Sequence, residues 1–296
     1  MALLASLPPW SLIAEVLRTL VLPSFGAAAA VCAIVCTLTK SERIRAVGAA
    51  VALLAGLFAG NHFHPLVDWW PTPLMRGWRS LLPVISMVIC AGTLLTMLPS
   101  RMHWAIGAGL RLLVAAASAW FLLEPLAPLT RWTTFGVLLA GMICTWEISR
   151  LVFPLLPRHG SLPVLVGVWG GAAATILIFA HSARFSDLAA LLATSLCAVG
   201  LAAAVWKQDL AFLLPVPCVF FPGLLLAGAA NTYSEVPVTA FAGVAFAPSA
   251  LLLVFLPQIR RLPLRALTAM AVTALLIPCA AGVALAARFE SLDYGE

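Results

Sequence analysis

ALTAMAVTALLIPCAAGVALAA, residues 266–287, is a run of apolar and small residues that contains no charged side chain. A helix needs roughly 20 mostly apolar residues to cross the hydrocarbon core of a bilayer. This run has that length, and it is continuous rather than an alternation of apolar and polar residues. It therefore predicts a transmembrane helix, and similar runs recur along the chain.

The whole chain has the composition of a protein surrounded by lipid. Of its 296 residues, 63% are hydrophobic and 9% are charged, whereas soluble domains carry about 25% charged residues. A water-soluble fold of this length could not cover its surface with so few charges. We expect an all-α, polytopic transmembrane helical bundle with short loops and no soluble domain.

Charged and proline-rich stretches divide the chain into ten candidate spans: 19–39, 46–63, 80–99, 105–123, 132–153, 163–181, 186–206, 210–230, 238–257 and 266–287. The second and seventh are the least sharply defined, because they are rich in alanine and tightly bounded. The connections between the spans are short. Residues 1–296 are therefore predicted to form a single integral membrane domain in contact with the lipid bilayer.

Basic residues in the loops predict the orientation, because lysine and arginine in short loops favour the cytoplasmic side. The face opposite the termini receives nine of them: Lys40, Arg43, Arg45, Arg101, Arg158, Lys207, Arg260, Arg261 and Arg265. The face of the termini receives six: Arg18, Arg76, Arg79, Arg131, Arg184 and Arg288. We expect both termini to be extracytoplasmic, in a bacterial inner membrane. The net charge of +6 then reflects topology and does not indicate nucleic-acid binding.

The segment NHFHPLVDWWP, residues 61–71, joins the second and third predicted spans on the outer face. Its notable side chains are His62, His64, Asp68, Trp69 and Trp70. Tryptophan prefers the headgroup layer, so the two tryptophans favour a turn at the membrane interface. A metal site is the alternative, because the two histidines could face one side of an extended loop with the aspartate as third ligand. Side chains that would orient such ligands cannot be identified, so we expect no metal.

Glu147 and Arg150 lie three residues apart in the fifth predicted span, so they share a helix face and can form an ion pair. Arg111, in the fourth span near the same membrane face, is the natural third member of this cluster. Inserting an ionisable group into a span costs at least about 2.5–3.5 kcal/mol, which makes it a candidate functional group. The acid is either neutralised by its arginines, or it couples ions or anchors a charged substrate. A neighbouring guanidinium keeps it ionised, which argues against proton coupling.

The eighth predicted span is rich in residues that disturb helices: Pro215, Pro217, Pro222 and Gly223. Each proline removes a backbone donor and clashes with the preceding turn, so we expect this span to be kinked or unwound. Irregular backbone at membrane depth survives only inside protein or beside a water-filled cavity, which predicts an interior position. Broken helices form substrate sites in many transporters, whereas in scaffolds kinks only shape the packing. The sequence favours packing and leaves both open.

Two GxxxG pairs, Gly56 with Gly60 and Gly167 with Gly171, predict faces on which helix backbones approach closely. Such matches arise easily in a chain rich in alanine and glycine. They predict tight packing, within the chain or with another subunit, and no chemistry.

Motifs of familiar enzyme classes are missing from the sequence, including the P-loop, GxSxG and HExxH. We therefore expect no catalytic residues and no cofactor. The preferred function is a non-catalytic membrane subunit that packs with partner helices or with copies of itself, because the spans offer few polar residues. The alternative is a small-solute transporter or permease that uses the broken eighth span and the Glu147 cluster. A membrane-embedded lipid-modifying enzyme ranks third.

Overall fold

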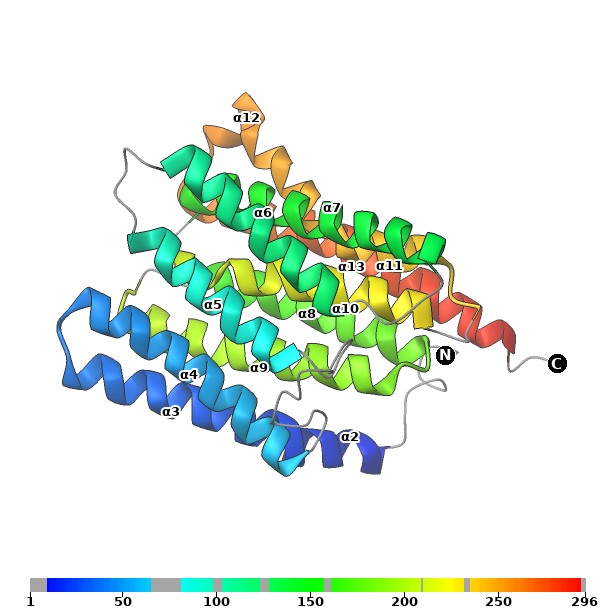
Figure 1. Cartoon of the computed structure of the whole chain (residues 1–296), viewed down its shortest axis with the longest axis horizontal. Helices are drawn as coiled ribbons and strands as arrows, with labels where there is room; N and C mark the ends of the chain where they lie inside the picture. The colour runs from blue at the N-terminus through cyan, green and yellow to red at the C-terminus, as the bar shows by residue number, and fades with distance from the viewer. Residues whose placement is uncertain are drawn as a thin grey trace.

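The computed structural model describes residues 10–64, 81–97, 103–122, 128–156, 161–208, 210–231 and 235–293. These residues form helices joined by short turns, and no strand occurs among them. Figure 1 shows the helices side by side along the long axis of the molecule, with successive helices running in opposite directions. The prediction of an all-α bundle is confirmed.

The elements in chain order are α2 (Trp10–Val16), η1 (Leu17–Val21), α3 (Leu22–Leu38), α4 (Glu42–Phe63), α5 (Leu81–Met97), α6 (His103–Leu122), α7 (Pro128–Val152), η4 (Phe153–Leu155), α8 (Ser161–Phe179), α9 (Ala183–Val205), η5 (Ala211–Leu213), α10 (Pro215–Asn231), α11 (Val238–Ala245), η6 (Ala247–Phe255), α12 (Pro257–Arg260) and α13 (Leu264–Asp293). Of the short elements, η1 is a π-helical turn and η4, η5 and η6 are 3-10 helices. Each segment predicted from the sequence falls on one of these helices or on consecutive ones.

The predicted number of spans is supported only in part. Among the described residues, five helices are long and apolar enough to cross a membrane: Ala14–Leu38, Ile44–Phe63, Arg131–Leu155, Ala183–Val205 and Leu264–Phe289. A sixth span arises if α11 and η6, which meet at a bend of 41°, are taken together. The count of ten is not confirmed, because some helices are short. The 17 residues of α10 reach only about 26 Å, against a hydrocarbon core of about 30 Å.

The two ends of the described chain lie at the same end of the bundle. Figure 1 places the start of α2 and the end of α13 there, with the α3–α4 turn and α12 at the opposite end. This arrangement agrees with helices that alternate in direction. The assignment of either end to the cytoplasm remains a prediction.

An arginine closes the turn between α3 and α4. Arg45 donates from Nε to the carbonyl oxygen of Thr39 at 2.7 Å and from Nη2 to that of Cys36 at 3.2 Å. The last turn of a helix leaves carbonyl groups without helical donors and carries a partial negative charge. One guanidinium therefore satisfies two such groups and joins the first turns of α4 to the end of α3.

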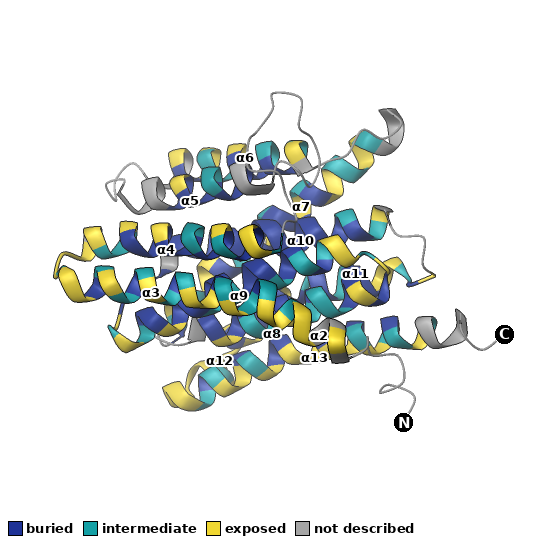
Figure 2. Ribbon diagram, turned by 90° about the horizontal axis from the view of Figure 1, so that it is seen from below, coloured by how far each residue is buried: buried dark blue, intermediate teal, exposed yellow. Residues whose placement is uncertain are grey.

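The helix α10 is the centre of the bundle. It contacts α5, α6, α7, α8, α9 and α11, and the residues from 212 to 226 are all buried. Figure 2 shows it as a buried element among helices whose outer faces are exposed. The fully buried Phe221 packs edge-on against Trp169 of α8, with ring centroids 5.2 Å apart. The interior position expected for the eighth predicted span is the one that α10 occupies.

The prediction that this span is unwound is wrong, because α10 is one continuous α-helix. Pro215 and Pro217 fall in its first turn, where N–H groups have no helical acceptor and proline is tolerated. The helix also continues past Pro222 and Gly223. The bent span is the next one, where α11 and η6 meet near Pro248.

The glycines Gly56 and Gly60 allow α4 to lie close to α3 and α9. A Cβ at Gly56 would lie 2.8 Å from the carbonyl oxygen of Ser24 and 2.9 Å from Ser195 Oγ. A Cβ at Gly60 would lie 2.3 Å from Leu191 Cδ1. Beside these glycines, the Oγ atoms of Ser24 and Ser195 form a buried hydrogen bond of 2.7 Å. This GxxxG pair therefore serves packing within the chain.

The second GxxxG pair does not form a close packing face within the chain. A Cβ at Gly167 would meet Cys197 Sγ at an ordinary 3.4 Å, and one at the exposed Gly171 would meet nothing within 4 Å. The close approach is made by Gly170, where a Cβ would lie 2.5 Å from Ala193 Cβ. The motif thus marks the right helix but the wrong glycines.

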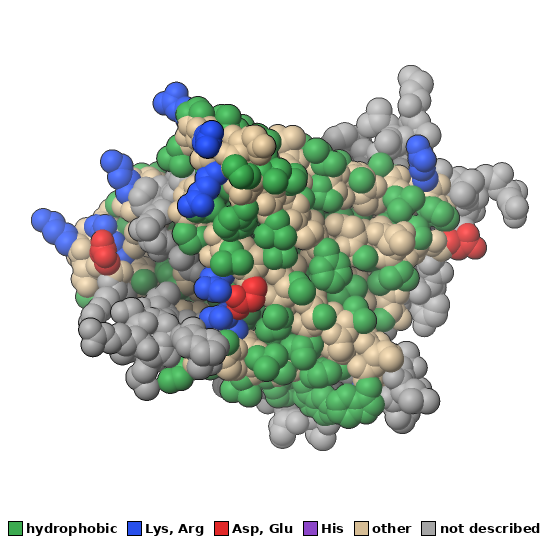
Figure 3. Space-filling view, turned by 90° about the horizontal axis from the view of Figure 1, so that it is seen from above, with side chains coloured by type: hydrophobic (Ala, Val, Ile, Leu, Met, Phe, Trp, Pro, Cys, Tyr) green, Lys and Arg blue, Asp and Glu red, His purple; other side chains and the backbone are tan. Residues whose placement is uncertain are grey.

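Large apolar side chains cover much of the outer surface. Leu22, Leu113 and Ile277 are each about two-thirds exposed, at 65%, 65% and 64%. Figure 3 shows one face that is largely hydrophobic, with most lysine and arginine side chains gathered towards one end. Such a surface, together with the long apolar helices, is consistent with an integral membrane protein.

Candidate functional site

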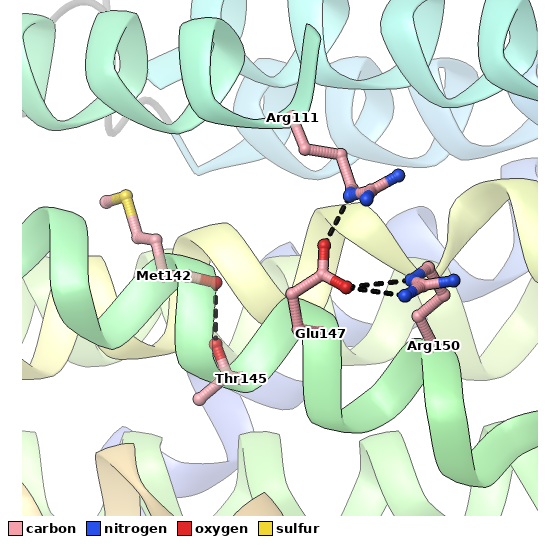
Figure 4. Close-up of polar contacts among 5 residues, drawn as sticks. All are labelled: Arg111, Met142, Thr145, Glu147 and Arg150. Carbon is pink, nitrogen blue, oxygen red and sulfur yellow. Dashed lines mark hydrogen bonds and ion pairs between the residues drawn. The ribbon is translucent and has the colours of Figure 1, made fainter. Parts of the chain in front are cut away.

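Three charged side chains meet between α6 and α7. Figure 4 shows Glu147 of α7 held by Arg111 of α6 on one side and by Arg150 of α7 on the other. Arg111 donates from Nε to Glu147 Oε1. Arg150 donates from Nε and Nη2 to Glu147 Oε2, each at 2.8 Å. Each carboxylate oxygen therefore has its own arginine.

We call Arg111, Glu147 and Arg150 the triad. The exposed fraction of the side chain increases in that order. The side chains are 13% exposed for Arg111, 33% for Glu147 and 51% for Arg150. Glu147 lies eight residues before Leu155, where this helical segment ends. Its distance from that end along the helix axis is about 12 Å. The triad is therefore set well inside the length of the helix.

The triad neutralises its acid and retains an excess positive charge. Two guanidinium groups and one carboxylate carry a net charge of +1, and the half-exposed Arg150 is the outermost of the three. The sequence predicts these three residues as one cluster, and the structure brings them together. The geometry suits an ion pair that joins α6 to α7 and presents a cation to its surroundings. Both oxygens of the acid already accept strong hydrogen bonds from arginines.

A hydrogen bond joins α7 to α10, and no pattern in the sequence predicts it. Pro222 has no N–H to donate to the carbonyl oxygen of Cys218, one turn earlier in α10. The hydroxyl of Thr145 donates to that oxygen at 2.8 Å. The same hydroxyl also lies near two carbonyl oxygens of its own helix, at 2.8 and 3.1 Å, but those have backbone donors in α7. The Cys218 oxygen is thus the acceptor that depends on it.

The bent span receives the same kind of contact from α8. The carbonyl oxygen of Val244 lies in the last turn of α11, which ends at Ala245, so it has no donor four residues later in the helix. The indole Nε1 of the buried Trp169 donates to that oxygen at 2.8 Å. Two carbonyl oxygens in the bundle interior, one freed by Pro222 and one at the end of α11, are therefore each bound by a side chain from another helix.

A small cavity lies beside the first turn of α10. It has a volume of about 20 Å³ and is lined by side chains that include Ser149, Trp169, Pro217, Cys218 and Pro248. This is close to the space of one water molecule. Glu147 and Arg111 do not line it. The cavity is therefore separate from the triad and too small for a solute.

His64, at the end of α4, contacts two other helices. Its Nδ1 lies 3.2 Å from Thr19 Oγ1 in η1, and its Nε2 lies 3.4 Å from Asp187 Oδ2 in α9. Hydroxyl, imidazole and carboxylate are the groups of a nucleophilic triad. Here, however, the hydroxyl of Thr19 donates to the carbonyl oxygen of Glu15 at 2.8 Å, so it does not give its proton to the ring. The two contacts of His64 therefore connect the end of α4 to η1 and to α9.

Of the other members of the predicted loop site, the structure describes only His62. His62 is exposed and packs edge-on against the neighbouring ring of Phe63. Asp68, Trp69 and Trp70 lie outside the described residues. Within the described part of the chain, no group of three or more histidine, cysteine, aspartate or glutamate side chains could hold a metal ion.

An aromatic cluster where α6 ends and α7 begins was not singled out from the sequence. The rings of Trp120, Trp132 and Phe135 lie 6.1–6.3 Å apart, and the guanidinium of Arg131 sits 4.3 Å above the Trp120 ring. Trp132 is 63% exposed. Aromatic and arginine side chains are typical of a membrane interface, so this cluster fits the headgroup layer.

Comparisons with known proteins identify no relative of the chain. No family model, no curated protein and no solved structure matches it. A functional proposal therefore rests on the geometry of the chain itself.

Proposed function

We propose that the chain is a non-catalytic subunit of a membrane assembly, a rigid helical scaffold that packs with partner transmembrane helices. The observation that carries this proposal is the closed packing around α10. Six helices surround this element, and the one carbonyl oxygen that Pro222 frees is bound by Thr145. An interior built in this way holds its helices in a fixed register.

The residues that a transporter would use are engaged in structural contacts. Both oxygens of Glu147 are bound by arginines, and the prolines of α10 leave the helix continuous. The cavity beside α10 has room for about one water molecule. A coupling carboxylate must exchange partners during transport, which this arrangement opposes. These features favour the scaffold over the permease.

The surface offers places for partner helices. Gly171 on α8 and Gly136 on α7 are exposed, and a Cβ added at either would meet nothing within 4 Å. Small residues on an outer face let another helix approach closely. The excess positive charge of the triad adds a chemical preference. It favours a partner helix, from another subunit or another copy of the chain, that places a carboxylate near Arg150.

We further propose that the chain resides in a bacterial inner membrane with both termini extracytoplasmic. The support is the distribution of basic residues, nine against six, in favour of the face opposite the termini. A reporter enzyme fused after Glu296 tests the orientation. Activity that requires the periplasm agrees with the proposal, whereas activity confined to the cytoplasm overturns it.

Copurification tests the scaffold. The tagged chain is extracted from its native membrane in mild detergent and, separately, in polymer nanodiscs, and the mass of the complex is measured. We expect a stoichiometric partner or a homo-oligomer. The Arg150→Gln variant leaves Glu147 paired with Arg111 but removes the excess charge, so recovery of the partner should fall. The Lys40→Gln variant, which removes an exposed charge elsewhere, should behave as the wild type.

The result that contradicts the scaffold is equally specific. A chain recovered alone in both preparations overturns the proposal. Specific solute flux in proteoliposomes, lost in Glu147→Gln, would assign transport instead.

A further inference from the structure

An apolar groove runs along the outside of the bent span. It has a volume of about 540 Å³ and lies between η6, the end of α11 and the middle of α13, with a lining that includes Gly243, Phe246, Leu252, Leu253, Leu256 and Pro278. The bend of 41° between α11 and η6 turns the chain here. A Cβ added at Gly243 would meet nothing within 4 Å, so the space beside this glycine is open. Its volume falls in the range of small-molecule sites.

The helix η6, which lines much of the groove, has a length close to the thickness of one leaflet of a bilayer. The nine residues of η6 rise about 18 Å, at roughly 2 Å per residue in a 3-10 helix. Half of the hydrocarbon core is about 15 Å. The helix that lines the groove is therefore about as long as one leaflet is thick.

Three arginines stand at the end of this groove. Leu256 is its last residue, and the N–H of Arg260 donates to the Leu256 carbonyl oxygen at 2.9 Å, so Arg260 lies one turn beyond it. Arg261 and Arg265 follow within five residues, and all three are exposed. None of them forms an ion pair with a described residue. Figure 3 shows basic side chains gathered at the end of the molecule where α12 lies.

We propose that this groove binds an anionic phospholipid, with an acyl chain along η6 and the phosphate at Arg260, Arg261 and Arg265. The apolar lining suits a hydrocarbon chain and not water. In a bilayer the hydrophobic effect does not draw an acyl chain into a groove, because surrounding lipid is equally apolar. Selectivity must come from the arginines, which attract an anionic headgroup at the membrane surface. This inference is independent of the scaffold role.

The arginine side of the site is tested with two matched double variants. The protein is reconstituted in nanodiscs with equal amounts of phosphatidylglycerol and phosphatidylcholine of the same acyl chains, and retained lipid is measured by native mass spectrometry. We expect the wild type to prefer phosphatidylglycerol. Arg260→Gln with Arg261→Gln should reduce that preference about 30-fold. Lys40→Gln with Lys207→Gln removes two exposed charges at the same end and should leave it unchanged.

The groove side is tested by filling the open space. Gly243→Leu should reduce retention of phosphatidylglycerol about tenfold without changing any charge. Gly26→Leu, at an exposed glycine of α3 where a Cβ would also meet nothing within 4 Å, should have no effect. Thermal denaturation of each variant checks that the bundle is intact.

Three results would overturn the proposal. An equal loss of preference in both double variants would mean a general surface field rather than a site. Displacement of the lipid by millimolar inorganic phosphate would mean that the arginines recognise the ion alone. A change in the mass of the protein assembly in Gly243→Leu, with lipid retention unaltered, would mean that a protein helix fills the groove.

Discussion

Replacing Thr145 by valine tests the hydrogen bond between α7 and α10. The hydroxyl donates to the Cys218 carbonyl oxygen at 2.8 Å, and Pro222 has no N–H for that oxygen. Valine keeps the shape of threonine but cannot donate. An unsatisfied buried acceptor costs about 1–3 kcal/mol, and hydrogen bonds in a membrane protein average about 0.6 and reach about 1.7 kcal/mol. We expect Thr145→Val to lower the free energy of unfolding by about 1 kcal/mol.

A double-mutant cycle separates this bond from other effects. In the Pro222→Ala variant the backbone N–H at position 222 is restored and can donate to the Cys218 oxygen, so the hydroxyl of Thr145 becomes dispensable. Thr145→Val should therefore cost almost nothing in that background, and the coupling between the two positions should be about 1 kcal/mol. The assay is reversible unfolding in mixed micelles by titration with a denaturing detergent, followed by tryptophan fluorescence.

Thr175→Val is the matched control. The hydroxyl of Thr175 donates to the Gly171 carbonyl oxygen of its own helix at 2.8 Å, on the outer face of α8. That substitution should change stability by less than about 0.5 kcal/mol. The reasoning is refuted if Thr145→Val costs as much with alanine at position 222 as with proline, because the hydroxyl would then stabilise the fold by another route.

Three further substitutions follow from the same contacts. Trp169→Phe keeps a ring in α8 but loses the donor to Val244, so it should cost about 1 kcal/mol in the same assay, and unchanged stability would contradict the contact. Glu147→Gln weakens the hydrogen bonds to two arginines and should cost about 1.5–3 kcal/mol; a neutral result would show that the triad does not hold α6 to α7. Gly56→Leu should cost at least about 1–3 kcal/mol by crowding α3 and α9, and it should lower the yield of monodisperse protein. Gly26→Leu, at an exposed glycine with open space around it, should leave that yield unchanged, and equal behaviour of the two variants would disprove the packing argument.

The charged triad shows how much of a membrane protein can be predicted from sequence. Glu147 and Arg150 are neighbours on one helix face by spacing alone. Arg111 joins them because charged side chains inside apolar spans are few and burial forces them to find partners. Sequence therefore predicted the members of the cluster. It did not predict that each carboxylate oxygen takes a different arginine, which depends on how α6 and α7 pack.

The span count shows where hydropathy fails. A run of apolar residues marks a helix that avoids water, but it does not tell whether lipid or protein surrounds that helix. The residues of α10 are as apolar as those of a span, yet six helices enclose it, and its 17 residues are fewer than a typical span needs. The same limit applies to His64, whose partners Thr19 and Asp187 come from distant parts of the chain and carry no local signal.

The prolines of α10 do not unwind it, although the sequence predicts that they do. The physical reason also bears on function. A proline inside a helix frees one carbonyl oxygen, and whether this breaks the helix depends on whether a neighbour supplies a donor. Here the donor to the Cys218 oxygen is Thr145, which lies 73 residues away in the chain. The sequence shows where the prolines are, but not which side chain donates to the freed oxygen. The proline that suggests a break in α10 therefore marks the place where α7 is hydrogen-bonded to α10.

Such attachments have a consequence for motion within the bundle. In lipid, apolar surfaces attract one another weakly, so register between helices depends on steric fit and directional hydrogen bonds. An oxygen freed by proline stands at one height along its helix, and only a donor at that height satisfies it. Sliding α10 along α7 by one helical turn, about 5.4 Å, would separate Thr145 from Cys218 and leave a buried acceptor alone. A transport cycle that moved α10 in this way would meet that cost at every turnover, whereas a scaffold never does.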